Sequence, residues 1–320
     1  MRKPARSIAC ALIDLAIVTH VHAAEPGDPL VLDGRGGWIG AIAFSPDGGT
    51  LASGSARGEV RLWNSETGEA KTALQGHADC VTAIAFSSDG KWLASGGYEG
   101  DVNLWDIRVG RHPRTLVGHR GPVMAATFTV NGKSLVTGGM DGTARIWDPV
   151  ERTELRVLRG HKSWVNAVAV SGGQRLATGS SDGTVKLWDF NLGRELASLP
   201  TNAGEVRSVA FSPAGALLAA GTRYGAVIIW NLAVRGDPRV LKGHSADVWC
   251  VAFSPDGAVL ASGNGDWNRP GEVKLWDTKT WSERAALKHS GEVLCLAFQP
   301  GRKTLAGGGW DGKIRLWRLE

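Results

Sequence analysis

Short segments in which apolar and polar residues alternate recur along this chain, and each ends in tryptophan. Examples are Glu59–Trp63, Thr184–Trp188 and Lys313–Trp317. Alternation with a period of two residues is typical of a half-buried β-strand. The terminal tryptophans follow one another at intervals of 41 to 46 residues: Trp63, Trp105, Trp147, Trp188, Trp230, Trp276 and Trp317. Such regular spacing indicates one structural unit copied along the chain. The pattern therefore predicts seven β-rich units over residues 29–320.

Each unit is predicted to contain four strands joined by turns. In the fourth unit we expect strands at Val165–Val170, Gln174–Thr178, Thr184–Asp189 and Arg194–Ser198. The first turn of some units reads Ser-Pro-Asp-Gly, as at Ser45–Gly48. Here proline presets φ, aspartate bonds back to the local backbone, and glycine takes the positive φ that a tight hairpin needs. A unit is therefore predicted to be a small sheet built from hairpins.

The first strand of a unit has one flat face and one bulky face. In the second unit Ala83 and Ala85 lie on the flat face. The other face ends in a larger side chain in each unit: Phe44, Phe86, Phe128, Val170, Phe211, Phe253 and Phe298. Sheets of this shape stack face to face on copies of themselves. Four short strands per period of about 42 residues are typical of propeller blades.

Two dipeptides at a fixed separation strengthen this interpretation, because they recur together. The clearest cases are Gly76-His77 with Trp105-Asp106 and Gly118-His119 with Trp147-Asp148. With these paired motifs the chain resembles the WD-repeat (WD40) family of β-propellers over residues 29–320. The resemblance implies an all-β fold: a seven-bladed WD40-type β-propeller.

The resemblance also implies a buried hydrogen-bond chain of Trp, Ser or Thr, His and Asp within a blade. Two units carry the full set: His119, Thr137, Asp141 and Trp147, then His161, Thr178, Asp182 and Trp188. The second unit has Glu99 at the Asp position. Three units depart further, with Arg35 and Arg57 in the first, Asn202, Ala220 and Tyr224 in the fifth, and Gly307 in the seventh. Because these residues cannot replace the missing members, we expect the three blades to lack the full network. A partial polar chain costs a blade stability.

The ring is expected to close by pairing its two ends. Pro29–Leu32 aligns with Arg239–Leu241 and its counterparts, which are outermost strands of their units. Because Pro29–Leu32 precedes the first full unit, we expect it to pair with the C-terminal strand at Lys313–Leu319. Pairing of this kind removes exposed strand edges, which otherwise invite aggregation.

The first 23 residues depart from the repeat and have the order of a secretory signal peptide. Three basic residues precede an apolar stretch, Ile8–Val18, and small residues lead to a cleavage point after Ala23. We therefore predict a signal peptide at 1–23, a short leader at 24–28, and a periplasmic or secreted protein. Asp14 interrupts the apolar stretch, so a frayed leader on a cytoplasmic protein is the alternative. No later segment is long and apolar enough to span a bilayer.

Charge and cysteine content argue against two kinds of function. The net charge of +5 comes from 36 basic and 31 acidic residues that are scattered along the chain. No basic run is suited to following phosphates, so we do not expect nucleic acid as a partner. Cys250 and Cys295 occupy one strand position that is small in the other units, which favours packing over a disulfide framework.

Histidine usage argues against catalysis and metal binding. Of eight histidines, five occupy the repeat position and two lie within residues 1–23, which leaves His112. A catalytic triad or a histidine-rich metal site therefore has little to draw on. Glycine clusters such as Gly307–Gly309 lack the context of a phosphate-binding loop. We expect no cofactor, no metal and no enzymatic activity; an enzyme that uses carboxylates across blades is the least favoured alternative.

One end of the ring is expected to hold the loops between blades, and it collects large residues that the fold does not require. The predicted partner-binding residues are Trp38, Tyr98, Met140, Trp164, Trp267, Trp310, Arg57 and Arg223. Large exposed aromatic residues are enriched in binding hot spots, although such rings also cover the ends of blades. Charge is uneven at this end, with Glu205, Asp247 and Glu292 at one position of units five to seven.

These features predict a non-catalytic scaffold that binds an unidentified protein partner through its aromatic-rich rim. We expect it to act as a monomer or as part of a hetero-complex. The alternative is a propeller that binds glycans or another small ligand, with the same aromatic residues stacked on that ligand.

Overall fold

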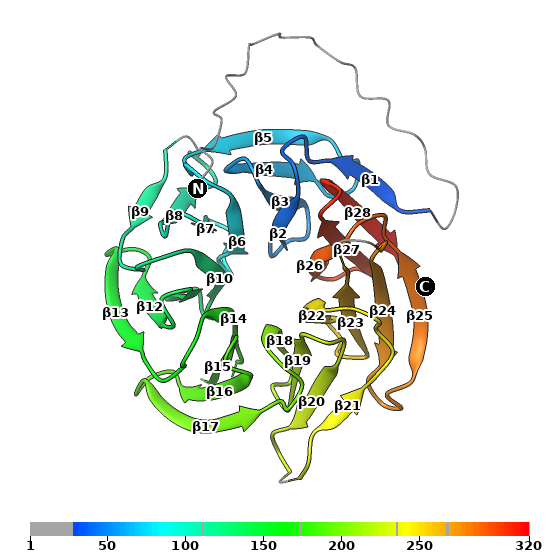
Figure 1. Ribbon diagram of the computed structural model, residues 1–320. Coiled ribbons are helices and arrows are strands. Elements are labelled where there is room, and N and C mark those ends of the chain that lie inside the picture. Colours follow the sequence, from blue (N-terminus) through cyan, green and yellow to red (C-terminus); the bar gives the residue numbers. More distant parts are fainter. Residues whose placement is uncertain (1–27, 110–111, 173–174, 235, 267–268, 320) are drawn as a thin grey trace, which may run out of the picture.

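The protein is described by a computed structural model that covers residues 28–109, 112–172, 175–234, 236–266 and 269–319. These residues form seven four-stranded antiparallel sheets arranged in a ring (Figure 1). The predicted all-β, seven-bladed propeller is confirmed. No helix capable of crossing a membrane occurs in these ranges. The predicted signal peptide at 1–23 lies outside the described residues, as does the predicted leader apart from Asp28.

Each blade runs outward from the central axis through four strands. The innermost strands are β2 (Ile39–Phe44), β6 (Val81–Phe86), β10 (Val123–Phe128), β14 (Val165–Val170), β18 (Val206–Phe211), β22 (Val248–Phe253) and β26 (Val293–Phe298). The second strands are β3 (Thr50–Ser55), β7 (Trp92–Gly97), β11 (Leu135–Gly139), β15 (Arg175–Ser180), β19 (Leu217–Thr222), β23 (Val259–Asn264) and β27 (Thr304–Gly309). Blades are numbered 1 to 7 in this order.

The two outer layers complete the blades. The third strands are β4 (Glu59–Asn64), β8 (Val102–Asp106), β12 (Ala144–Asp148), β16 (Thr184–Asp189), β20 (Val227–Asn231), β24 (Glu272–Asp277) and β28 (Lys313–Arg318). The outermost strands of blades 1 to 6 are β5 (Ala70–Gln75), β9 (Arg114–Leu116), β13 (Thr153–Leu158), β17 (Arg194–Pro200), β21 (Arg239–Leu241) and β25 (Glu283–Lys288). In blade 7 the outermost strand is β1 (Leu30–Asp33).

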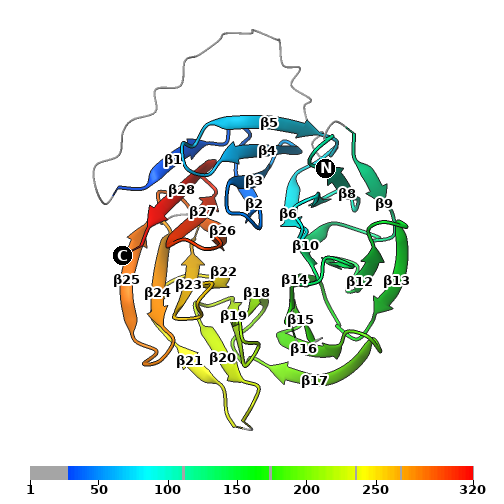
Figure 2. The same ribbon diagram turned by 180° about the vertical axis from the view of Figure 1, so that it is seen from behind.

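Blade 7 is built from both ends of the propeller. Strand β1 runs antiparallel to β28, with Leu30 opposite Leu316 and Asp33 opposite Lys313. Seen from behind, β1 lies along the outer edge of β28 (Figure 2). The backbone groups of β28 are therefore hydrogen-bonded on both sides, by β27 and by β1.

The strands of blade 4 agree with those predicted, with small changes at their ends. β14 and β16 have the predicted bounds. β15 starts at Arg175 and extends to Ser180, while Gln174 lies outside the described residues. β17 continues past Ser198 to Pro200, because its backbone stays paired with β16 as far as Thr184.

The periodic tryptophans form the wedges of the core. Trp188 is 3% exposed and shares a cluster with Val136 and Ile146 of the preceding blade. Trp230 likewise packs against Ala177 and Leu187 of blade 4. Burying a large apolar side chain in this way contributes about 2 to 3 kcal/mol. Stacking between adjacent blades is therefore the main source of cohesion in the ring.

The blades approach each other so closely that one position requires glycine. A Cβ added to Gly54 of β3 would lie 2.4 Å from Cγ1 of Val81, the first residue of the next innermost strand. Any larger residue would push the two blades apart. Cys250 and Cys295 lie at another tight position as buried free thiols, in keeping with a packing role.

The innermost strands share a bulge after their first residue. The register shifts between Val81 and Ala83, for example, and so leaves Thr82 unpaired. The side chain of such a residue can reach the next blade: Nδ2 of Asn166 donates a hydrogen bond to the carbonyl oxygen of Val206 at 2.8 Å. Bulges re-aim side chains in this way, and here one of them links blade 4 to blade 5.

Candidate functional site

Seven equivalent backbone hydrogen bonds mark one end of the ring. In each blade the turn between the second and third strands donates an N–H to the carbonyl oxygen just before the innermost strand, at 2.8 to 3.3 Å. The donor–acceptor pairs are Ala56–Trp38, Tyr98–Cys80, Met140–Pro122, Ser181–Trp164, Arg223–Glu205, Gly265–Asp247 and Trp310–Glu292. We call these fourteen residues the rim. Because the pair repeats in each blade, all fourteen lie at the same end of the ring.

The rim has an apolar half and a charged half. From blade 7 round to blade 4, nine successive positions carry no charged residue: Trp310, Trp38, Ala56, Cys80, Tyr98, Pro122, Met140, Trp164 and Ser181. The remaining five are Glu205, Arg223, Asp247, Gly265 and Glu292. Five predicted partner-binding residues therefore lie in one continuous half, and the structure supplies that continuity.

Three of these aromatic residues are about half exposed to solvent. The exposed fractions are 50% for Trp310, 46% for Trp164 and 43% for Tyr98. Trp38 and Met140 are only partly exposed, so these two also cover the ends of their blades. What distinguishes these rings from other exposed apolar side chains is that they share one half of the rim, since grouped apolar surface is what marks contact sites.

Trp38 and Trp310 form a stacked pair across the junction of blades 7 and 1. Their ring centroids lie 5.9 Å apart, and the planes differ by 3°. The ring of Trp38 also lies over Gly40, where an added Cβ would be 2.5 Å from Cζ3 of Trp38. The two indoles are thus held in place before any partner arrives. The sequence predicted each residue separately as a partner-binding residue. Nothing in the sequence indicated that these two tryptophans, which are far apart in the chain, contact each other.

Arg207 organises the charged half, and sequence reasoning missed it. Its guanidinium pairs with Glu205 at 2.9 Å and with Asp247 at 3.4 Å. The same group lies 4.6 Å from the ring centroid of Trp249. Arg207 and Trp249 both follow the first residue of an innermost strand, the bulge position. The available signal was the charge of Arg207 at a strand position that is uncharged in the other six blades.

The charged half also contains a carboxyl group without a cation. Glu292 is only 7% exposed, and no described basic side chain pairs with it. Burial raises the pKa of Glu292, and the negative charges of Asp266 and Asp247 raise it further. Arg207 and Arg223 pair with Glu205 and Asp247 and so offset part of the negative charge on this side of the rim.

The other predicted partner-binding residues have separate surroundings. Arg223 pairs with Glu205 at 2.7 Å and lies over the ring of Tyr224, with its guanidinium carbon 5.4 Å from the centroid. Arg57 is exposed beside the rim in blade 1. Trp267 lies outside the described residues.

The polar chain implied by the family resemblance is present in blades 3 and 4. In blade 3, Trp147 donates from Nε1 to Oγ1 of Thr137 at 2.8 Å, and His119 joins Thr137 at 2.8 Å and Asp141 at 3.1 Å. In blade 4 the corresponding hydrogen bonds link Trp188, Thr178, His161 and Asp182 at 2.7 to 2.9 Å. These groups are saturated inside their blades, which leaves them no free capacity for a ligand.

The electrostatics of this chain favour a neutral histidine beside a charged aspartate. Burial lowers the pKa of His161, although Asp182 opposes the effect. Burial alone would raise the pKa of Asp182, but hydrogen bonds from Thr184, from the Lys162 backbone and from His161 lower it to about 2. The pair is thus a structural hydrogen bond at neutral pH, and a poor proton donor or acceptor for chemistry.

Other blades keep part of the chain. In blade 2, Glu99 takes the place of aspartate beside His77. In blade 6, His244 bonds to Ser262 at 2.6 Å, and burial lowers the pKa of that histidine to about 3. In blade 7, Arg315 donates to Nε2 of His289 at 2.9 Å, where other blades use a hydroxyl. Within the described ranges no cluster of His, Cys, Asp or Glu is placed to hold a metal ion.

Blade 5 lacks the chain altogether. Asn202 replaces the histidine and adopts a φ of 52°, in the left-handed region that asparagine tolerates. Ala220 replaces the hydroxyl residue, and Tyr224, at the position of the aspartate, is 73% exposed. As expected from the sequence, no network forms here.

Comparison with protein families accounts for the whole ring. The family model described as "WD domain, G-beta repeat" matches the chain seven times, once per repeat: residues 29–64, 68–106, 110–148, 152–189, 193–231, 237–277 and 281–318. A comparison with curated proteins found no match. With its seven repeats forming the seven blades, the chain belongs to the WD40 (G-beta repeat) family, whose propellers are generally non-catalytic scaffolds for protein interaction.

Proposed function

We propose that this protein is a non-catalytic scaffold that binds a protein partner through the apolar half of its rim. The observation that carries the proposal is the run of nine successive uncharged rim positions. Three aromatic rings within it are 43 to 50% exposed. Rigid aromatic side chains at an accessible surface supply most of the binding energy in many interfaces.

The charged half gives the interface a direction. Acidic groups lie on blades 5 to 7, at Glu205, Asp247 and Glu292, and therefore adjoin the apolar half at both of its ends. Charges at the margin of an interface orient a partner and select against wrong ones more than they add affinity. A fitting partner therefore has an apolar patch flanked by basic residues.

The experiment compares proximity labelling by three versions of the protein in its native host. The first is the wild type, and the second is Trp164→Ala with Trp310→Ala. The third is a matched control, Val109→Ala with Leu192→Ala, which removes exposed apolar side chains from turns at the opposite end of the ring. Each true hot spot contributes about 2 kcal/mol, so the rim variant should lose its labelled neighbours while the control keeps them.

A glycan-binding propeller predicts a different outcome. The rim variant and the control would then label the same proteins, and an array of glycans would retain the wild type but not the rim variant. That result would replace the scaffold proposal with the alternative.

The export of the protein is proposed on the sequence of residues 1–23. Its test is cell fractionation of a C-terminally tagged chain with and without those residues. We expect the full chain outside the cytoplasm, shortened by cleavage after Ala23, and the truncated chain inside. A full-length cytoplasmic chain would contradict export and leave the rim proposal intact.

A further inference from the structure

Blade 5 lacks the groups that hold the tryptophan of its neighbours. In blades 4 and 6, Nε1 of Trp188 and Trp276 donates to a hydroxyl at 2.9 and 2.8 Å. In blade 5 that position is Ala220, opposite Ile228 in the strand register. Among the described residues nothing accepts a hydrogen bond from the indole of Trp230, which is 7% exposed. Trp230 is thus packed as a wedge but lacks the polar partner of its counterparts.

Blade 5 also lacks an ion pair that lies beside this tryptophan in other blades. In blades 4 and 6, the strand partner of the hydroxyl residue is a lysine, and the strand partner of the tryptophan is a glutamate. The lysine and the glutamate form an ion pair. These pairs are Lys186–Glu195 at 2.9 Å and Lys274–Glu283 at 2.8 Å. By the same register Ile228 takes the place of the lysine in blade 5. Asp237 takes the place of the glutamate: it precedes Arg239, the strand partner of Ile229, by two residues, just as Glu195 precedes Ala197, the strand partner of Leu187. No described cation pairs with Asp237.

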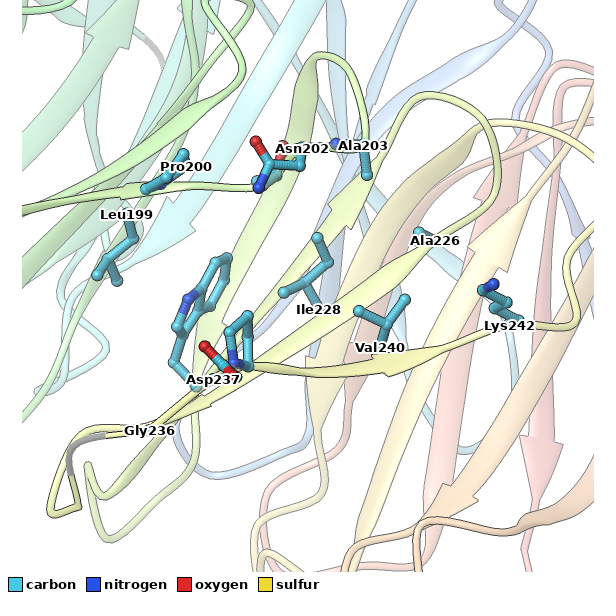
Figure 3. A pocket seen from close by; sticks show the side chains of 13 residues that line it. Leu199, Pro200, Asn202, Ala203, Ala226, Ile228, Gly236, Asp237, Val240 and Lys242 are labelled. Atoms are coloured by element: carbon cyan, nitrogen blue, oxygen red, sulfur yellow. Dashed lines mark hydrogen bonds between the residues drawn. The ribbon is translucent and has the colours of Figure 1, made fainter.

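The missing groups coincide with a cavity. A hollow of about 580 Å³ lies between the outer strand of blade 4 and the outer strands of blade 5 (Figure 3). Leu199 and Pro200 of β17 line one side, while Ile228 and Val240 line the side formed by the blade 5 sheet. Trp230 also contributes to the wall. Most of the cavity wall is therefore apolar, and it also contains Asn202 and the indole of Trp230, whose N–H has no partner among the described residues.

Opposite charges lie at the two ends of this cavity. Figure 3 shows Asp237 near Gly236 at one end and Lys242 at the other. Both residues are exposed, so each can meet a charged group of a ligand without a large desolvation cost. A ligand with an apolar stem and a cationic head could place the stem in the cavity and pair its charge with Asp237.

We propose that this cavity is a second binding site, which takes one lysine or arginine side chain from an extended segment of a partner protein. The aliphatic stem lies against Leu199 and Val240, and the charged head pairs with Asp237. A backbone carbonyl oxygen of the segment accepts the hydrogen bond from Trp230. Lys242 at the far end repels a second basic residue, so the segment carries a single basic residue rather than a run.

The protein's own blades provide the template for this arrangement. Lys186 in blade 4 and Lys274 in blade 6 are largely buried and reach a glutamate beside the blade tryptophan. In blade 5 the chain supplies the acid and the tryptophan but replaces the lysine with Ile228. The partner segment restores from outside the contact that the neighbouring blades make internally.

The binding test uses the full propeller and four pools of immobilised heptapeptides. The pools have lysine, arginine, norleucine or glutamate at the centre and mixed residues elsewhere. Because norleucine keeps the apolar stem without the charge, it should retain the protein about tenfold less than lysine or arginine. Equal retention by the norleucine pool, or no retention by any pool, overturns the proposal.

Two variants locate the site. Asp237→Asn should bring retention by the lysine pool down to that by the norleucine pool, while Glu151→Gln, an exposed acid elsewhere, should change nothing. Ile228→Lys supplies the missing lysine from the chain itself and should abolish retention in a folded propeller. If Asp237→Asn binds the lysine pool like the wild type, the site is wrong, whether or not Ile228→Lys folds.

The same pools separate this site from the rim. Trp164→Ala with Trp310→Ala should retain the lysine pool as well as the wild type does, because neither residue lines the cavity. Loss of retention in that variant would place the basic peptide on the rim and overturn the proposal. The rim proposal itself is tested by labelling in the native host, so the two can fail independently.

Discussion

Blades 4 and 5 are neighbours with the same four-stranded frame, yet their interiors differ. Trp188 is held by Thr178 and backed by His161 and Asp182, whereas Trp230 has no polar partner among the described residues. Both tryptophans pack into the preceding blade. The comparison teaches that apolar stacking between blades determines the fold, while the polar chain is a local addition that a blade can lose.

The largest expected effect comes from removing the wedge itself. Trp188→Ala should destabilise the protein by about 3 to 5 kcal/mol, because it leaves a large cavity between blades 3 and 4. Trp230→Ala should cost about 1 kcal/mol less, since its indole has no hydrogen bond to lose. Urea unfolding of both variants measures the difference. Equal losses would mean that the polar chain adds nothing to the wedge.

A smaller effect is expected from the hydroxyl in blade 4. Thr178→Ala removes the acceptor of Trp188 and the partner of His161. Two buried polar groups are then unsatisfied, so we expect a loss of about 2 to 3 kcal/mol. Thr67→Ala, in an exposed turn, is the control and should be neutral. Thr178→Ala gives blade 4 the alanine that blade 5 has at this position. An unchanged free energy of unfolding would show that blade 4 does not need the polar chain either.

The buried histidines predict that acid destabilises the fold. Burial lowers the pKa of His244 to about 3, against an ordinary value of 6.5. Below pH 6.5 this histidine is protonated in the unfolded chain but stays neutral in the folded chain. The free energy of unfolding therefore falls as the pH drops through this range. From pH 7 to pH 5 this histidine should cost about 2 kcal/mol. His244→Asn, which copies the asparagine of blade 5, should flatten the pH dependence of the unfolding free energy; an unchanged slope would contradict the assignment.

The smallest expected effect on stability is at the rim. Trp164 and Trp310 are about half exposed, and neither belongs to the buried clusters between blades, although Trp310 stacks on Trp38. Their replacement by alanine should change the free energy of unfolding by at most about 1 kcal/mol. Thermal unfolding of the double variant measures this. A loss comparable with that of Trp188→Ala would show that these rings serve the fold rather than a partner.

Much of the architecture follows from the repeat alone. The spacing of Trp63 and its six counterparts predicts seven blades, and the alternation before each tryptophan predicts its strand. These signals are local and repeat seven times, so an irregularity in one unit, such as Ala220 in the fifth, does not obscure them. The absence of a network in blade 5 was equally readable, because each missing side chain is visible in the sequence.

Features that depend on contacts between units were not predictable in the same way. The stacking of Trp38 on Trp310 joins the first and last blades, and the pairing of Arg207 with Asp247 joins blades 5 and 6. Both depend on how loops from different repeats meet. The cavity beside Trp230 is harder still to foresee, since it results from what neighbouring side chains fail to fill.

The difference between the two blades can be tested most directly by giving blade 5 its hydroxyl back. Ala220→Ser places an acceptor where Ser262 serves Trp276 in blade 6. We expect the free energy of unfolding to rise by about 1 kcal/mol. Ala219→Ser, its neighbour on the opposite face of the strand, buries a hydroxyl without such a partner and should lower it. If Ala220→Ser destabilises the protein as much as Ala219→Ser does, Trp230 does not lack an acceptor, and the proposed difference between blades 4 and 5 is wrong.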